Sequence, residues 1–194
     1  MNTTAPPRSQ PALTVPDTVR LIIFDADGTL RRTTVAGRPC PHGPGEWELL
    51  PRVRETLSAI DWSARRLGIA SNQDQIAYGW LSAEMARQLF TTLIAEATDG
   101  RTEAVIRFCP HALETVCHCR KPQPGMLLEI MQACELAPAQ TLFVGDAETD
   151  REAARRAGTS FMWAWDFFGW NLSNSDREKT EHTESTAQME TDLM

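Results

Sequence analysis

Five short apolar runs constrain the fold of this chain more than any other feature of the sequence. They lie at residues 19–28, 67–71, 103–108, 141–146 and 160–165. The segments between them carry helical periodicity or helix-start signals, at 51–66, 82–97, 124–136 and 148–158. Strands that alternate with helices form a parallel sheet with right-handed crossovers. The sequence therefore predicts an α/β fold, a Rossmann-like three-layer sandwich with a five-stranded parallel sheet.

The 194 residues suffice for one domain with a real core, which we place at 18–170. Residues 1–17 have no signal-peptide core and are expected to be a flexible leader, which indicates a cytoplasmic protein. Residues 171–194 hold six acidic side chains against two basic ones and few large apolar groups, so we expect a disordered acidic tail. No apolar run is long enough to span a membrane. The net charge of −7 argues against general nucleic-acid binding.

Polar side chains stand where several of the predicted strands end. Asp25 and Asp27 follow the first run, Ser71 ends the second and Asp146 ends the fourth. The carboxyl ends of parallel strands meet at one edge of the sheet, where ligands bind in such folds. Three carboxylates that converge there favour Mg²⁺, which prefers oxygen ligands. Ordinary turn acids are the alternative interpretation of these residues.

The same residues suit phosphoryl transfer. A carboxylate can attack phosphorus and form an acyl phosphate, and a second carboxylate can serve as general acid and base. Ser71 and backbone N–H groups can hold phosphate oxygens, and Lys121 can offset the charge of the transferring phosphoryl group.

The stretch "FDADGTL", Ser71, Lys121 and "VGDAETD" together resemble the four motifs of haloacid dehalogenase-like phosphatases. The resemblance implies that Asp25 is the nucleophile and that Asp27 protonates the leaving group and then activates water. It also implies that Ser71 and Lys121 bind the phosphoryl group. Mg²⁺ would be held by Asp25, Asp146 and the backbone carbonyl of Asp27, with Asp150 behind them. The expected substrate-binding residues are Ser71, Asn72, Arg120 and Lys121.

The stretch "CPHALETVCHC" at 109–119 supplies four metal ligands in one loop, namely Cys109, His111, Cys117 and Cys119. Four such ligands complete a tetrahedral Zn²⁺ shell and leave no position for substrate, so the expected site is structural. Zinc would then fix the loop that leads to Lys121. Free thiols in a loop are the alternative.

The remaining histidines and cysteines are given plainer roles. His118 lies between two ligands and is expected to be a bystander. The second "CPH" stretch, at 40–42, has few neighbouring ligands and is expected to be a plain loop, within a loop at 31–46. Cys134 is expected in a helix that faces the core.

The stretch "CPHALETVCHCRKPQPGM" resembles the zinc loop of one branch of these phosphatases. That branch contains the D-glycero-D-manno-heptose-1,7-bisphosphate phosphatases and the histidinol-phosphate phosphatases, and it has no large cap domain. This chain differs from the branch at Ala26 and Tyr78, where arginine is usual or frequent. The resemblance implies a phosphatase that acts on a small phosphorylated metabolite, such as a sugar phosphate, a bisphosphate or a compound like histidinol phosphate. We also expect the protein to be a monomer.

Two other functions stay open on the sequence. In a polynucleotide 3′-phosphatase, Arg31, Arg32 and Arg38 could meet a nucleic-acid backbone, and the aromatic residues at 163–170 could stack on bases. Packing of those aromatic residues in the core is the plainer interpretation. A non-catalytic, zinc-stabilised binding module is the third possibility.

Overall fold

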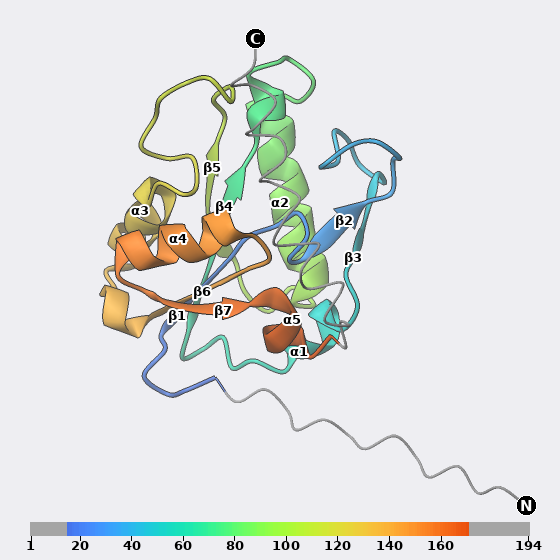
Figure 1. Cartoon of the computed structure of the whole chain (residues 1–194). Helices are drawn as coiled ribbons and strands as arrows, with labels where there is room; N and C mark the ends of the chain where they lie inside the picture. Colours follow the sequence, from blue (N-terminus) through green and yellow to red (C-terminus); the bar gives the residue numbers. More distant parts are fainter. Residues whose placement is uncertain (1–14, 171–194) are drawn as a thin grey trace, which may run out of the picture.

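The computed structural model describes residues 15–170 and contains a five-stranded parallel sheet (Figure 1). Its strands are β1 (Leu21–Phe24), β4 (Arg66–Asn72), β5 (Ala104–Cys109), β6 (Thr141–Gly145) and β7 (Ser160–Trp163). Their order across the sheet is β5-β4-β1-β6-β7. The predicted fold class is confirmed. Most of the predicted leader and all of the predicted tail lie outside the described residues, so the domain limits stay predictions.

Helices cover both faces of the sheet and make a three-layer sandwich. They are α1 (Val53–Ser58), α2 (Ala83–Ala97), α3 (Gly125–Cys134), α4 (Glu148–Ala157) and α5 (Ala164–Phe168). Helices α1, α2 and α5 share one apolar cluster with the sheet, and α3 and α4 share another. None of the helices in residues 15–170 is long and apolar enough to cross a membrane.

Strand β1 shows how the sequence produces the two apolar clusters, one on each face of the sheet. Side chains alternate in direction along a strand. Ile22 and Phe24 therefore enter the cluster under α1, α2 and α5, and Leu21 and Ile23 enter the cluster under α3 and α4. All four are fully buried, which is the pattern of a central strand in a sheet covered on both faces.

The predicted helix at 51–66 is wrong in extent, because α1 occupies only Val53–Ser58. Arg52 has a φ of 64° and cannot continue a right-handed helix toward Pro51. At the other end, the indole N–H of Trp62 donates to the Leu57 carbonyl oxygen at 2.8 Å. The Asp61 carboxylate also accepts hydrogen bonds from the amide and hydroxyl of Ser63. Side chains thus satisfy the backbone groups that a longer helix would have paired.

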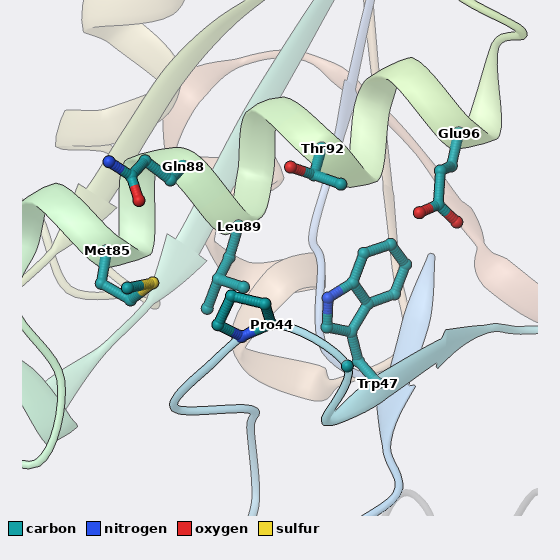
Figure 2. Close-up of a pocket in the computed structure, with 8 residues that line it drawn as sticks. Pro44, Trp47, Met85, Gln88, Leu89, Thr92 and Glu96 are labelled. Atoms are coloured by element: carbon teal, nitrogen blue, oxygen red, sulfur yellow. The ribbon is translucent and has the colours of Figure 1, made fainter.

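The segment at 31–46 is only partly the predicted loop. Strand β2 (Arg31–Thr33) pairs antiparallel with β3 (Trp47–Leu49), and residues 34–46 connect them. The hairpin lies beside α2, and the two enclose a pocket of about 360 Å³. Figure 2 shows the indole of Trp47 and the ring of Pro44 facing Leu89 and Thr92 of α2.

The predicted strand at 160–165 ends early, because α5 begins at Ala164. Three aromatic residues of α5 pack inward. The rings of Phe167 and Phe168 lie 5.3 and 6.2 Å from the ring of Phe24, and Trp165 is 4% exposed. These three rings are therefore core residues and are not open to stacking on a ligand, whereas Phe161 and Trp163 are only partly buried.

Candidate active site

Asp25 stands directly after β1, at the carboxyl end of the sheet. Its amide donates to the Val144 carbonyl oxygen at 2.9 Å, so pairing with β6 continues to this residue. The side chain is nearly buried, with 8% of its surface exposed. Burial raises the pKa of Asp25 to about 7, although the nearby Lys121 ammonium acts in the opposite direction. Asp25 is thus a carboxylate whose charge depends on cations beside it.

Lys121 supplies one of those cations. Its Nζ lies 2.6 Å from Oδ1 of Asp25 and 2.6 Å from Oδ1 of Asp150. Burial alone would lower the pKa of Lys121, but the Asp150 and Asp25 carboxylates outweigh it and raise the pKa above its ordinary value. The lysine is therefore held as a charged ammonium at the edge of the sheet.

Asp146 brings a third carboxylate to the same place from the end of β6. Thr29 Oγ1 donates to its Oδ1 at 3.0 Å. Gly28 has a φ of 93°, and a Cβ on it would collide with the Asp146 carboxylate. The glycine of "FDADGTL" thus permits the close approach of the loop after β1 to Asp146.

The carboxylates of Asp25, Asp146 and Asp150 fit a hard cation. One oxygen from each lies within 4.8 Å of the others. Burial, together with Asp25 and Asp150, raises the pKa of Asp146 well above its ordinary value. One lysine ammonium against three carboxylates leaves two negative charges, and oxygen ligands of this kind suit Mg²⁺. Asp150 lies close to the other two acids, and its predicted place behind the ligands stays a prediction.

The side chain of Asp27 points to a different set of partners. Its Oδ1 accepts from Nε of Arg31 at 2.8 Å, and its Oδ2 accepts from Nε2 of Gln73 at 2.8 Å. The same Gln73 nitrogen lies 3.1 Å from Oγ of Ser71, which is buried at the end of β4. The side chains predicted to be the general acid and the phosphate-binding hydroxyl are thus joined by one amide.

The structure gives Asn72 and Arg120 partners within the protein. Asn72 Oδ1 accepts from the amide of Lys121 at 3.0 Å, and Nδ2 donates to its carbonyl oxygen at 3.2 Å. Arg120 donates from Nη2 to the His111 carbonyl oxygen. Both side chains therefore fix the backbone around Lys121, and their contact with substrate stays a prediction.

The four predicted zinc ligands form one cluster beside this site. Cys109 Sγ lies 3.4 Å from His111 Nδ1 and 3.7 Å from Cys117 Sγ. Cys119 Sγ lies 3.2 Å from the same histidine nitrogen and 3.5 Å from Cys117 Sγ. Zinc bond lengths of about 2.3 Å to sulfur and 2.0–2.1 Å to nitrogen give tetrahedral edges of roughly 3.5–3.8 Å.

The chemistry of the four side chains also fits zinc. Burial raises the pKa of Cys109, and it raises that of Cys119 to about 12. Crowded, buried thiols of this kind ionise readily only when a cation binds them. All five cysteines are free of disulfides, and the side chain of His118, 85% exposed, lies outside the cluster. Zinc at these four residues remains our proposal.

Pairing of β5 with β4 places the loop at 109–119 next to the carboxyl end of the sheet, where Ser71 lies. Cys109 is the register partner of Asn72 in the pairing of β5 with β4. Figure 1 shows the loop after β5 and the segment between β4 and α2 at the same end of the sheet. The cluster is therefore one strand away from Ser71 and two residues before Lys121.

Sequence reasoning missed Arg31, Gln73 and Thr29 as parts of this site. Gln73 stands two residues after Ser71 and so shares its side of the strand end, a signal that was available. Contact of Arg31 with a nucleic-acid backbone, considered for the polynucleotide alternative, does not fit the structure, because Arg31 is 1% exposed and paired with Asp27. The two exposed arginines of the hairpin also have acidic partners, Glu48 for Arg32 and Glu46 for Arg38.

The fold and its acidic edge define a haloacid dehalogenase-like phosphatase, an enzyme that hydrolyses phosphoric monoesters. Within this class, the chain belongs to the family described as polynucleotide kinase 3 phosphatase, whose family model matches residues 20–188.

Several proteins that resemble this chain carry the name heptose bisphosphate phosphatase. The chain is 30% identical over 143 residues to D-glycero-beta-D-manno-heptose-1,7-bisphosphate 7-phosphatase of Pseudomonas putida, covering 72% of this chain and 79% of the relative. A probable heptose bisphosphate phosphatase of Thermoplasma volcanium is 26% identical, covering 74% and 97%. The crystal structure of D,D-heptose 1,7-bisphosphate phosphatase from B. bronchiseptica, complexed with magnesium and phosphate, has a TM-score of 0.66 at 24% identity, covering 88% and 99%. This last likeness supports the fold.

Proposed function

We propose that the enzyme hydrolyses a small phosphate monoester, a sugar phosphate first of all, through a phosphorylated Asp25. The observation that carries the proposal is the contact between Asp25 and Lys121 within a cluster of three carboxylates, two of them buried. Asp25 keeps 8% of its side-chain surface exposed, and Lys121 can neutralise one oxygen of a phosphate that reaches it. The named relatives support a phosphorylated sugar as the substrate class.

The reaction has two balanced steps. In the first, an Asp25 oxygen forms a bond to phosphorus while the bond from phosphorus to the ester oxygen breaks, and Asp27 gives its proton to the leaving oxygen. In the second, Asp27 takes a proton from water, the water oxygen attacks phosphorus, and the bond to Asp25 breaks. Ser71 and the ammonium of Lys121 hold phosphate oxygens in both steps. Mg²⁺, held by Asp25, Asp146 and the Asp27 carbonyl, would supply further charge neutralisation.

The test is turnover of an aryl phosphate and a panel of sugar phosphates by the full chain, with Mg²⁺ or with a chelator. Asp25→Asn should reduce kcat by at least about a thousandfold, because it removes the nucleophile and keeps the shape. Asp166→Asn is the matched control, since Asp166 is exposed on α5. Near wild-type turnover by Asp25→Asn would refute the mechanism.

A polynucleotide 3′-phosphatase is the second candidate, and one observation favours it beyond the family description. Trp80 is 61% exposed, and its ring lies 5.3 Å from the ring of Tyr78 and 6.2 Å from that of His42. Tyr78 Oη also accepts from the amide of Leu113 at 3.4 Å, in the loop that leads to Lys121. An exposed aromatic surface of this kind can stack on a base next to a terminal phosphate.

The two candidates differ in their response to Trp80→Ala. For a 3′-phosphorylated oligonucleotide, loss of a stacking ring should raise KM about tenfold, given roughly 1–3 kcal/mol per stacked base. For a sugar phosphate we expect KM within about twofold. A kcat/KM that is higher for the oligonucleotide than for every sugar phosphate in the panel would replace the first candidate with the second.

The non-catalytic binding module is set aside, because the chain is a phosphatase. That the enzyme is a cytoplasmic monomer stays a prediction.

A further inference from the structure

We propose that Arg31 is a positioning residue for Asp27, and that it keeps the Asp27 carboxylate aimed at the leaving oxygen during proton transfer. The inference rests on the proposed function, because it takes Asp27 as the general acid and base. Arg31 itself is buried and is not expected to touch the substrate.

The guanidinium of Arg31 grips both oxygens of the Asp27 side chain. Nε lies 2.8 Å from Oδ1, and Nη2 lies 3.4 Å from Oδ2. Gln73 donates to Oδ2 from the β4 side at 2.8 Å. A planar fork that contacts both oxygens fixes the rotation of a carboxylate as well as its position, which a lysine ammonium does not do.

Aromatic rings pack around the Arg31 guanidinium and hold it in place. The centre of the guanidinium lies 4.9 Å from the ring centroid of Phe90 on α2 and 6.0 Å from that of Trp47 on β3. Arg31 is also the register partner of Leu49 in the hairpin. The hairpin and α2 therefore fix the arginine, and the arginine fixes Asp27. This gives the hairpin, whose Trp47 also lines the pocket of Figure 2, a connection to the catalytic edge.

A purely structural role explains this arrangement less well. A buried ion pair is often no more stable than well-packed apolar side chains of the same volume. Here the pairing is also incomplete, because Nη1 of Arg31 is buried without a hydrogen-bond partner in residues 15–170. The side chain of Asp27 keeps 14% of its surface exposed, so its partner is buried while the carboxylate itself can still reach a substrate. An ion pair that adds little to stability but fixes the geometry of Asp27 is suited to orienting that carboxylate.

Proton transfer makes orientation valuable. The donating oxygen must come within about 2.6–3.2 Å of the leaving oxygen, and misplacement by about 1 Å can reduce the rate roughly a hundredfold. This help matters most for alkyl esters, whose leaving oxygen is strongly basic, and least for activated aryl esters. An effect of Arg31 that acts through Asp27 must therefore depend on the leaving group.

The test compares Arg31→Met, Arg31→Lys and the matched control Arg32→Met on one alkyl phosphate and one nitro-substituted aryl phosphate. We expect Arg31→Met to lower kcat for the alkyl ester by about thirtyfold to a hundredfold and for the aryl ester by less than about fivefold, with KM nearly unchanged. Arg31→Lys should recover part of the loss. Arg32, whose exposed side chain pairs with Glu48, should tolerate the change with both rates within about twofold.

A second comparison places the effect on Asp27. In an Asp27→Asn background, Arg31→Lys should cause no further loss of kcat, because the group that it positions is gone. Equal losses for the two esters, or full additivity with Asp27→Asn, would overturn the inference while leaving the proposed function intact. If circular dichroism shows that Arg31→Met does not fold, Arg31→Lys replaces it, and its loss of kcat for the alkyl ester is compared with its loss for the aryl ester. A wild-type enzyme that hydrolyses neither ester would overturn the proposed function and this inference with it.

Discussion

The Nζ of Lys121 lies 2.6 Å from Oδ1 of Asp150, and the two side chains are 4% and 1% exposed. Lys121 reaches this position from the loop that follows β5, and Asp150 lies in the first turn of α4, where Oδ2 accepts from the amide of Ala147 at 3.1 Å. The ion pair thus joins the loop after β5 to α4 next to Asp25, the proposed nucleophile. It makes the lysine part of the folded framework, in addition to the role that we propose for it in the reaction.

Lys121→Met should therefore destabilise the metal-free protein strongly. The change leaves the buried carboxylates of Asp25 and Asp150 without their ammonium, and breaking a buried pair in this way costs about 3–5 kcal/mol. Urea unfolding at neutral pH measures the loss. Arg54→Met is the control, because the exposed pair of Arg54 with Glu96, at 3.8 Å, should contribute no more than about 1 kcal/mol. Equal losses in the two variants would contradict the buried role of the lysine.

Magnesium should stabilise the protein more at high pH than at low pH. Burial raises the pKa of Asp25 from 3.8 to about 7, and that of Asp146 is raised as well. A raised pKa means that the folded state favours the protonated acid, so the contribution of Asp25 to stability falls as pH rises from about 4 through about 7. The metal-free protein should lose stability over this range.

Because Mg²⁺ binds the ionised carboxylates, saturating Mg²⁺ at about pH 8 should restore roughly 2–3 kcal/mol, and at about pH 5 much less. Thermal unfolding with Mg²⁺ or with a chelator at the two pH values measures the difference. Asp25→Asn should reduce both the pH dependence and the magnesium effect. A magnesium effect of equal size at the two pH values would show that these acids do not bind the metal.

One Zn²⁺ should copurify with each chain, and Cys117→Ser should weaken its binding. Metal analysis by mass spectrometry after dialysis gives the content. Cys134→Ser is the matched control, because Cys134 lies on α3 outside the cluster of four ligands. Zinc content that is equal in the two variants, or absent from folded wild-type protein, would rule out a zinc site at this cluster.

Asn72→Ala should lower kcat while zinc content stays the same. The Asn72 side chain makes two hydrogen bonds with the backbone of Lys121, at 3.0 and 3.2 Å, so its loss frees the lysine from the end of β4. Loss of aim should reduce kcat by about tenfold to a hundredfold. Cys117→Ser should reduce turnover as well, but together with zinc. Unchanged kcat in Asn72→Ala would mean that Lys121 is aimed by the zinc loop alone.

The acidic edge could be predicted because parallel topology places the ends of separated strands together. Asp25, Ser71 and Asp146 each follow an apolar run, and that pattern is visible in one dimension. The spacing of the four zinc-loop ligands is similarly local. These features needed no knowledge of which side chains are buried.

The features that were missed depend on contacts between distant segments. The three-residue strands of the hairpin carry no periodicity, and Arg31 lies between Phe90 and Trp47 in a site that only the folded chain creates. Helix α1 ends early because the Trp62 indole turns back to the Leu57 carbonyl. An arginine in a polar stretch is usually exposed, so the burial of Arg31 could not be read from its neighbours.

Rapid acid quenching of the reaction in Asp27→Asn is the most direct test of whether Asp25 is phosphorylated during turnover. This variant keeps the nucleophile but lacks the group that activates water, so the phosphorylated enzyme should accumulate on a good aryl leaving group. Mass spectrometry of the peptide that contains Asp25 is the measurement. We expect one phosphoryl group on Asp25, formed in the presence of Mg²⁺ and absent in the Asp25→Asn, Asp27→Asn double variant. Phosphate release with Asp25 never modified, or a phosphoryl group on another residue, would refute Asp25 as the nucleophile.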